Sequence, residues 1–434
     1  MPRWASLWIY RLLLPVFLII ALPGWWLRML RRGGIGTGLG ERVGIHHRDR
    51  ESEPCGAIHL HAVSVGEVMI ALRLIRAWLR REPGQSFVLA TGTATGHAVA
   101  SSAGIDGLRV TYAPLDFRFA VRRYFDRFEP RRIVLVEGEA WPHLLIAARQ
   151  RGMPVVLVNA RMSPRSARRY RRFAALLRPW FSLLDGVAVQ EPGDEVIWKL
   201  LGVDPANIHP TGSLKYDPDD AVPPHIRDEF GAMLGKFGEA RRVVLAASTH
   251  TGEDAWIARA ASQAADQVLI VTAPRHAERR DEVVVELRTA GFQPVLRSTM
   301  DAATVALPGT SVLVIDSTGE LRDWTAYADV VVIGKSILAT GGQNPVEAVL
   351  AGKPVVFGPH MENFEPLASA MVAAGGAIRV EDAASLTRAI RTTLDPVHAR
   401  RQAAAASACL DRHRGAVDRV LDLLEAGNDR ENRR

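Results

Sequence analysis

Apolar and polar residues follow one another along most of the chain in blocks typical of strands and helices taken in turn. In the first half, short runs of Val, Ile, Leu and Ala are separated by longer stretches whose apolar residues recur at helical spacing. The predicted strands cover residues 57–63, 87–91, 109–112, 132–136, 155–159 and 186–189. Strands and helices alternating at this spacing predict a mostly parallel sheet with helices on both faces. Ligands bind such sheets at the loops that follow the carboxyl ends of the strands.

The second half of the chain repeats this pattern. Its predicted strands cover residues 243–247, 268–272, 312–315 and 330–333, and each runs into a loop of small and polar residues. Because 434 residues exceed what one hydrophobic core usually holds, two domains are expected. The chain is predicted to divide into an N-terminal anchor helix (1–32), a first Rossmann-like domain (33–217), a linker rich in proline and aspartate (218–224), a second Rossmann-like domain (225–410) and a C-terminal helix with a frayed tail (411–434). An alanine-rich stretch from about residue 398 to 425 is predicted to be helical.

The segment 341–364 is the best candidate for a ligand site from local pattern alone. It opens with two glycines, which turn the chain readily at positive φ. Asn344 is then expected as a helix N-cap, Pro345 as the first helical residue and Glu347 in the first turn, before a buried strand at 354–359. Such a helix start suits a nucleotide, with backbone amides for phosphate and Glu347 for ribose hydroxyls. A plain strand-to-helix turn would explain the same residues equally well.

The N-terminal residues 4–30 form the most apolar run, without any charge from residue 12 to 27. This approaches the length of about 20 residues that a bilayer-spanning helix needs. A buried helix is one alternative. A helix lying in the membrane interface is another, because two prolines interrupt the run. The arginines that follow it favour a cytoplasmic position for the rest of the protein.

Composition narrows the choice of partner only slightly. The net charge of +7 permits nucleic acid, anionic lipid or phosphorylated substrates, and two cysteines exclude a disulfide scaffold. Residues 161–180 carry seven arginines and no acid. They suit either a solvated helix face or a surface for anionic lipid or a phosphorylated acceptor. Nucleic acid is disfavoured, because the aromatic residues of this stretch sit at helical core spacing.

With these residues laid out, the chain resembles the bacterial 3-deoxy-D-manno-octulosonic acid (Kdo) transferases of lipid A assembly over nearly its whole length. Nine motifs carry the resemblance, in the family's order and spacing: HAVSVGEV at 61–68, VEGEAWPHL at 136–144, NARMS at 159–163, TGSLKYD at 211–217, ASTHTGED at 247–254, APRHAER at 273–279, DSTGEL at 316–321, GGQNPVE at 341–347 and FGPHMENF at 357–364. The family consists of membrane-anchored glycosyltransferases of the two-Rossmann-domain (GT-B) type. The resemblance therefore implies transfer of Kdo from CMP-Kdo to a lipid A precursor, with inversion at the anomeric carbon.

The resemblance also implies roles for individual residues. Glu67 matches the family's catalytic base, although an acid at a helix start would look the same. Glu137 and Lys215 match positions that stabilise the transition state, although Glu137 could equally make a structural hydrogen bond. The CMP contacts carry over onto Pro274, Arg275, Thr318, Gly319, Glu320, Asn344, Pro345, Val346 and Glu347. The family resembles metal-independent catalysts, so we expect no metal and no cofactor, and we interpret His250, His276 and His360 as structural.

Two departures from the family pattern lie beside the expected donor loops. Lys335 stands where the family usually has glycine, and Gln343 where it usually has histidine. They motivate an alternative, a transferase of the same fold that uses another CMP-ulosonic acid or another lipid acceptor. A tethered binding protein without catalysis, and a hydrolase or epimerase acting on nucleotide sugars, are alternatives of other classes.

Overall fold

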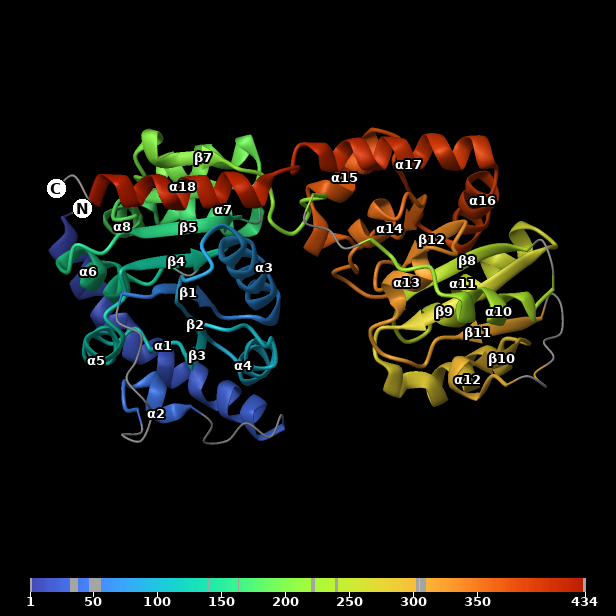
Figure 1. Ribbon diagram of the computed structural model, residues 1–434, viewed down its shortest axis with the longest axis horizontal. Coiled ribbons are helices and arrows are strands. Elements are labelled where there is room, and N and C mark those ends of the chain that lie inside the picture. The colour runs from blue at the N-terminus through green and yellow to red at the C-terminus, as the bar shows by residue number, and fades with distance from the viewer. Residues whose placement is uncertain are drawn as a thin grey trace. The chain divides into compact units, whose positions relative to one another are not determined.

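The computed structural model shows a chain that forms two compact units (Figure 1). The first unit contains Met1–Asp217 and His413–Arg434, and the second contains Pro218–Arg412. The structure describes residues 2–31, 38–46, 56–138, 140–162, 164–219, 223–238, 241–301, 304 and 310–431.

In the first unit, the described strands form one parallel sheet in the order β3-β2-β1-β4-β5-β6-β7. Its strands are β1 (Ile58–Ala62), β2 (Phe87–Thr91), β3 (Leu108–Tyr112), β4 (Arg132–Val136), β5 (Val155–Ala160), β6 (Gly186–Val189) and β7 (Ile208–Pro210). Its helices are α1 (Arg3–Arg31), α2 (Leu39–Arg42), α3 (Val65–Arg81), α4 (Ala94–Ser101), α5 (Arg118–Phe128), α6 (Pro142–Gln150), α7 (Pro164–Arg172), α8 (Ala174–Phe181), α9 (Glu195–Leu200) and α18 (Ala416–Glu431).

Both faces of this sheet are buried, which is why its strands appear in the sequence as continuous apolar runs. Leu60 and Val134 belong to a core that also contains buried residues of α3, α4 and α18. Leu135 and Leu157 point to the opposite face and join the core that holds residues of α5, α6 and α8. Polar side chains are therefore left to the ends of the strands, where the loops lie.

In the second unit, the described strands form another parallel sheet, in the order β10-β11-β9-β8-β12-β13-β14. Its strands are β8 (Arg242–Thr249), β9 (Val268–Pro274), β10 (Gln293–Leu296), β11 (Ser311–Val314), β12 (Val330–Ile333), β13 (Val355–Phe357) and β14 (Ala377–Arg379). Its helices are α10 (Asp228–Gly235), α11 (Glu253–Ala264), α12 (Arg280–Thr289), α13 (Leu321–Thr325), α14 (Val346–Leu350), α15 (Leu367–Ala373), α16 (Ala383–Thr393) and α17 (Pro396–Asp411). The prediction of two parallel-sheet α/β domains is thus confirmed.

The differences from the predicted elements concern short or terminal segments. Strands β7, β10 and β14 have three or four residues each, too short for the hydrophobic pattern to predict them. The alanine-rich stretch is not one helix: α17 ends at Asp411, and α18 begins at Ala416. Residues 161–180 likewise form two helices, α7 and α8, separated at Phe173. In α8, Trp180 and Phe181 are buried as their spacing predicted, whereas Phe173 is exposed.

Helix α1 runs without a break through both of its prolines. Its Ser6 hydroxyl donates to the Leu176 carbonyl of α8, and its Tyr10 hydroxyl donates to Asp116 Oδ2 at 2.7 Å. The expected spanning anchor at residues 1–32 gains no support: in the described part of the chain, no helix is both long and apolar enough to cross a bilayer.

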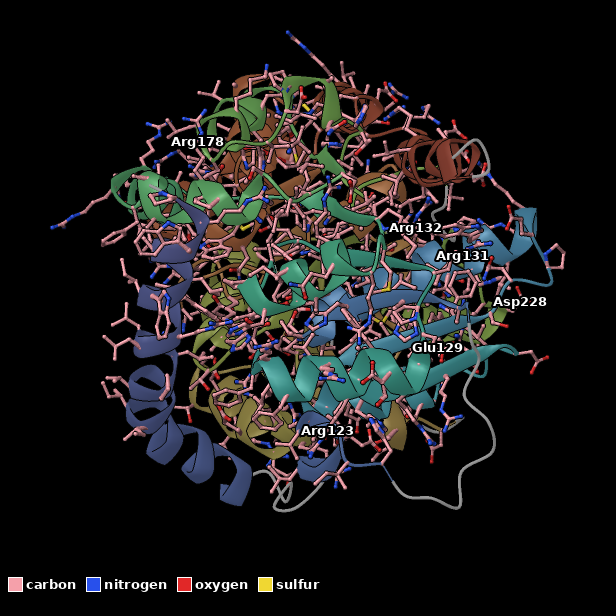
Figure 2. The ribbon with its side chains drawn as sticks, turned by 90° about the vertical axis from the view of Figure 1, so that its left-hand side faces the viewer. Arg123, Glu129, Arg131, Arg132, Arg178 and Asp228 are labelled. Carbon is pink, nitrogen blue, oxygen red and sulfur yellow. The ribbon has the colours of Figure 1, made fainter. Side chains whose placement is uncertain are left out.

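The end of the chain returns to the first unit through α18. Arg81 of α3 forms ion pairs with Asp418, Asp422 and Glu425 of α18 at 2.6, 2.7 and 3.2 Å. Arg132, labelled near Glu129 and Arg131 in Figure 2, donates from the start of β4 to the Leu424 carbonyl. Helix α18 is thus a structural part of the first unit.

The segment before and at the start of α18 also fixes the loop 211–217. Ser213 N donates to His413 Nδ1 at 3.1 Å, and the Arg419 guanidinium donates to the Thr211 carbonyl. The Asp217 carboxylate accepts hydrogen bonds from Gly415 N at 3.0 Å and Val417 N at 2.9 Å. We call these contacts the C-terminal clamp. They fix both ends of a loop whose middle carries Lys215.

Replacing Asp217 tests the C-terminal clamp. Asp217→Ala leaves two backbone N–H groups near the start of α18 without their charged acceptor, which should lower the free energy of unfolding of the first unit by about 1–3 kcal/mol. Denaturant unfolding of the full-length protein measures the loss. Asp106→Ala, in an exposed turn of the same unit, is the control and should change stability little. Equal stability of the two variants would contradict the clamp.

Candidate functional site

Glu67 lies at the carboxyl end of β1, in the first turn of α3. Ser64 caps this helix: its hydroxyl accepts from Glu67 N at 3.2 Å, and the Glu67 carboxylate in return accepts from Ser64 Oγ at 2.8 Å and from Val63 N at 2.9 Å. Ser64 is thus the N-cap of α3, and Glu67 returns a hydrogen bond to the capping side chain. Glu67 therefore has a structural role, and the same bonds hold its nearly buried carboxylate in one orientation. A carboxylate has about four acceptor positions, so these bonds do not exhaust its capacity to accept a proton.

Glu137 and Lys215, two candidates from distant parts of the sequence, meet in an ion pair. Lys215 Nζ lies 2.6 Å from Glu137 Oε1, and about a third of each side chain is exposed. Glu137 directly follows β4, the neighbour of β1, so it shares the carboxyl edge of the sheet with Glu67. A pair this exposed adds little to stability. Its position at the ligand-binding edge favours a role in the site.

Asn159 supports this arrangement, and its individual role was not predicted. It is fully buried at the end of β5, donates from Nδ2 to Glu137 Oε1 at 3.3 Å, and accepts at Oδ1 from Leu214 N at 2.9 Å. Asn159 and Glu137 both adopt positive φ, of 53° and 63°. Non-glycine residues take this conformation at a cost and gather at functional sites. Asn159 thus links the Glu137 turn to the loop that carries Lys215.

A cavity of about 390 Å³ opens at the same edge of the sheet, beside the Val63–Ser64 turn that holds Glu67. The residues that line it are Leu14, Arg42, His61, Val63, Ser64, Gly92, Thr93, Ala113, Pro114, Leu115, Asp116 and Trp141. Burial lowers the pKa of His61 to about 4, so its imidazole is neutral at physiological pH. Arg42, His61 and Asp116 were not predicted to have a role in the site. Of the three, only His61 lies in one of the nine family motifs, HAVSVGEV at 61–68.

The donor residues predicted in the second unit follow neighbouring strands. The order β11-β9-β8-β12 places the loops after these strands at one edge. Gln343 Nε2 lies 3.2 Å from His250 Nε2, and the rings of His250 and His276 are 6.4 Å apart. The structure thus brings the loops at 249–253, 274–276 and 334–347 together. Among the described residues, no three potential metal ligands form a group, and metal independence stays a prediction.

Arg275 and Glu347 are the charged members of this edge. Arg275 follows Pro274 at the end of β9, its side chain is exposed, and its backbone N donates to the Thr249 carbonyl at 3.0 Å. Glu347 is exposed as a residue, yet the protein displaces enough water from its carboxyl to raise the pKa, against the opposing charges of Arg322 and Arg275. These two arginines are therefore close enough to act on Glu347 electrostatically.

Two details of the predicted nucleotide segment need correction. Pro345, not Asn344, occupies the N-cap position of α14, and the exposed Asn344 instead accepts from Val346 N at Oδ1, at 3.1 Å. Pro345 and Val346 are buried. Helix α14 has only five residues, so its dipole and free backbone amides favour a bound phosphate less than the sequence pattern indicated.

In the loop after β11, two of the predicted CMP-binding residues are exposed to solvent, and the third, Glu320, contacts the protein. Thr318 and Gly319 are exposed, and Gly319 adopts φ 85°, which favours glycine. The Glu320 carboxylate instead pairs with Arg297, at 2.8 Å from Nε and from Nη2, and accepts from the Ser317 hydroxyl. Glu320 therefore shapes this loop through its own contacts within the protein.

Glu253, fully buried at the start of α11, joins two of the donor loops. Its carboxylate accepts from the backbone N of His250 at 2.9 Å, of Lys335 at 2.6 Å and of Ile337 at 3.1 Å. Lys335 itself adopts φ 54°, a conformation that a glycine takes without strain. The departure at position 335 is thus accommodated by a strained backbone that Glu253 holds in place.

Comparison with known proteins agrees with this geometry. A family model described as 3-deoxy-D-manno-octulosonic-acid transferase (kdotransferase) matches residues 37–218. The chain is 36% identical over 418 residues to the 3-deoxy-D-manno-octulosonic acid transferase of Bordetella pertussis, covering 92% of this chain and 95% of that one. It is 32% identical over 392 residues to the protein of the same name from Haemophilus influenzae, covering 89% and 90%.

A solved structure with the same architecture is the putative UDP-N-acetylglucosamine 2-epimerase of Listeria monocytogenes. Its TM-score is 0.56 at 13% identity, over 87% of this chain and 97% of that one, so the likeness is one of fold, of the GT-B type. The relatives named above match nearly their whole length at more than 30% identity. The chain therefore belongs to the 3-deoxy-D-manno-octulosonic acid transferase family and is a glycosyltransferase.

Proposed function

We propose that this enzyme transfers Kdo from CMP-Kdo to a lipid A precursor, with inversion at the anomeric carbon. The observation that carries the proposal is the Lys215–Glu137 ion pair at the sheet edge that also holds Glu67, in a chain of this family. Lys215 and Glu137 form the ion pair, and Glu67 lies at the same edge, in the first turn of α3. Such a group suits catalysis better than it suits a binding protein that has lost activity.

Glu67 is the proposed base. The hydroxyl oxygen of the acceptor attacks the anomeric carbon of Kdo while its proton passes to the Glu67 carboxylate, and the bond from that carbon to the CMP phosphate breaks. The capping contacts from Val63 N and Ser64 Oγ would hold the carboxylate ready for this transfer. Lys215, steadied by Glu137, would offset the negative charge that develops in the transition state.

The second unit is the proposed donor unit. The exposed guanidinium of Arg275 would bind the CMP phosphate. Glu347 would accept hydrogen bonds from the ribose hydroxyls, and the Thr318–Gly319 turn would present backbone amides. The charges of Arg322 and Arg275 oppose the rise that burial causes in the pKa of Glu347, and so favour its ionised form.

We propose a location at the cytoplasmic face of the inner membrane, and the exposed side chains of α1 support contact with a membrane. Its exposed side chains include Trp4, Trp8, Leu12, Ile19 and Ile20, each about two-thirds exposed or more. Apolar side chains of this size exposed along one helix are typical of membrane association. We propose that α1 rests on the membrane that contains the acceptor, together with the arginine-rich helix α7 and Arg178 of α8.

Lys335 and Gln343 favour a second candidate, transfer of a related CMP-ulosonic acid or to a related acceptor. Both lie among the donor loops, where Gln343 contacts His250 and the Lys335 backbone is fixed by Glu253. A panel of CMP-ulosonic acids tested on one acceptor separates the two candidates. A clear preference for CMP-Kdo supports the main proposal.

Replacing Glu67 by glutamine separates catalysis from capping. Glu67→Gln keeps one oxygen to accept from Val63 N, and its amide NH2 can donate to Ser64 Oγ, but it cannot take up a proton. It should therefore melt within a few degrees of the wild type. Its transfer rate should fall about 10²- to 10⁴-fold, the usual contribution of a general base. The rate is measured by mass spectrometry of the Kdo-bearing product. Glu67→Gln with wild-type activity would show that Glu67 is only a helix cap.

Arg275→Gln tests the donor site. We expect CMP to bind the variant about 10-fold or more weakly, because a charged hydrogen bond to phosphate is lost. Calorimetric titration of CMP measures the affinity. Arg280→Gln, in an exposed position on the neighbouring helix α12, is the control. Equal CMP affinity in both variants would place the phosphate elsewhere.

A further inference from the structure

Arg42 brings a positive charge to the cavity at the edge of the first sheet. Among the described residues that line the cavity, it is the only arginine or lysine. Its side chain is 9% exposed. Burying a cation is unfavourable unless anionic or polar groups compensate it.

The compensation of Arg42 within the protein is partial. Its Nη2 donates to the Gly92 carbonyl at 2.8 Å, and its guanidinium lies over the Tyr112 ring at 4.5 Å. Its Nε is buried without a hydrogen-bond partner in the described part of the chain. Burial lowers the pKa of Arg42, and neighbouring Glu41 and Tyr112 do not reverse the fall. The guanidinium nevertheless stays charged at neutral pH, because arginine starts from a pKa above 12.

The nearest acid is already engaged elsewhere. One oxygen of Glu41, Oε2, accepts from Thr111 Oγ1 at 2.9 Å and from Tyr112 N at 3.0 Å. The Arg42 carbonyl accepts from Leu115 N at 2.8 Å. Gly38 has φ 72°, and a Cβ there would lie 2.0 Å from the Tyr112 ring. These contacts fasten α2 to the end of β3, so Arg42 is held in place before any ligand binds.

Two further groups define the chemistry of the cavity. His61 is 5% exposed, and its Nε2 has no hydrogen-bond partner among the described residues. Its imidazole is neutral, because burial lowers its pKa. Asp116 contributes a carboxylate, but both of its oxygens are engaged by Tyr10 Oη, His143 N and Leu144 N. The Asp116 oxygens are therefore already hydrogen-bonded within the protein, whereas Arg42 Nε and His61 Nε2 have no partner among the described residues.

We propose that this cavity binds a phosphate monoester carried by the acceptor sugar, with Arg42 as the cation and His61 as a neutral hydrogen-bond partner. The inference deepens the proposed function and rests on it. A volume of about 390 Å³ lies within the range of small-molecule sites and exceeds what phosphate alone would fill, so a sugar ring can accompany it. The cavity adjoins the turn that orients Glu67, so a phosphate bound there would place the acceptor near the base.

The test uses full-length protein, saturating CMP-Kdo and two acceptors that differ only in their phosphate monoesters. Wild-type enzyme should show a lower KM for the phosphorylated acceptor. Arg42→Gln should raise that KM about 10- to 100-fold, the loss expected for a charged hydrogen bond, and should change the KM of the dephosphorylated acceptor little. Arg42→Lys should recover part of the affinity, because lysine supplies charge without the planar fork. Arg122→Gln, at an exposed position on α5, is the control.

Several results would overturn the inference. Equal wild-type KM values for the two acceptors would show that the phosphate is not recognised. An equal loss on both acceptors in Arg42→Gln, with unchanged CMP affinity and melting temperature, would assign Arg42 a structural role only. Rescue of the Arg42→Gln defect by acceptors carrying a carboxylate in place of phosphate would replace a phosphate site with a general anion site.

Failure of the proposed function can be told apart from failure of this inference. If wild-type enzyme transfers Kdo to neither acceptor, the proposed function fails. Direct titration of the two acceptors then still decides the inference. Tighter binding of the phosphorylated acceptor to wild type than to Arg42→Gln supports it, and equal binding rejects it. If Arg42→Gln does not fold, the wild-type preference together with Arg42→Lys gives the same decision.

Discussion

Parallel strands all end at the same edge of a sheet, and the rest of this structure depends on that constraint. Both sheets are buried on both faces, so the interior admits few polar side chains, and the chemistry is confined to the edges. Glu67 and Glu137 follow β1 and β4, and Asn159 lies at the end of the adjacent strand β5, for this reason. In the second unit, Thr249, Arg275 and the 334–347 loop are gathered by the same rule.

The conformation of the loops at these edges is strained in a consistent way. Glu137, Asn159, Ser248 and Lys335 have positive φ without being glycine, and each lies at or just beyond the end of a central strand. Hydrogen bonds from buried side chains hold these loops in their strained conformation. Asn159 is bonded on both sides of the first site, and Glu253 collects backbone N–H groups from both loops of the second. Backbone strain and buried polar anchors thus occur together.

The sequence could predict features that depend on neighbouring residues, but not contacts between residues far apart in the chain. The central strands and the position of Glu67 follow from local patterns, because hydrophobic runs and helix-start residues are read within a few positions. The pairing of Lys215 with Glu137 is not local, and only the resemblance to a family placed both residues in one site. Arg42 escaped notice because it lies in a polar connector whose attachment to β3 depends on Glu41 and Gly38. The resemblance assigned Glu320 to the nucleotide, and its ion pair with Arg297 could not be predicted from local pattern.

The return of α18 to the first unit has a consequence for how the protein is made. Val420, Leu421 and Leu424 complete the core on one face of the first sheet, and they are synthesised after the whole second unit. When the second unit has emerged from the ribosome, the first unit, whose synthesis began earlier, therefore still lacks the core residues of α18. The order of domain completion during translation is thus the reverse of the order of the domains in the sequence. Until α18 has emerged, the face of α3 that packs against it stays exposed.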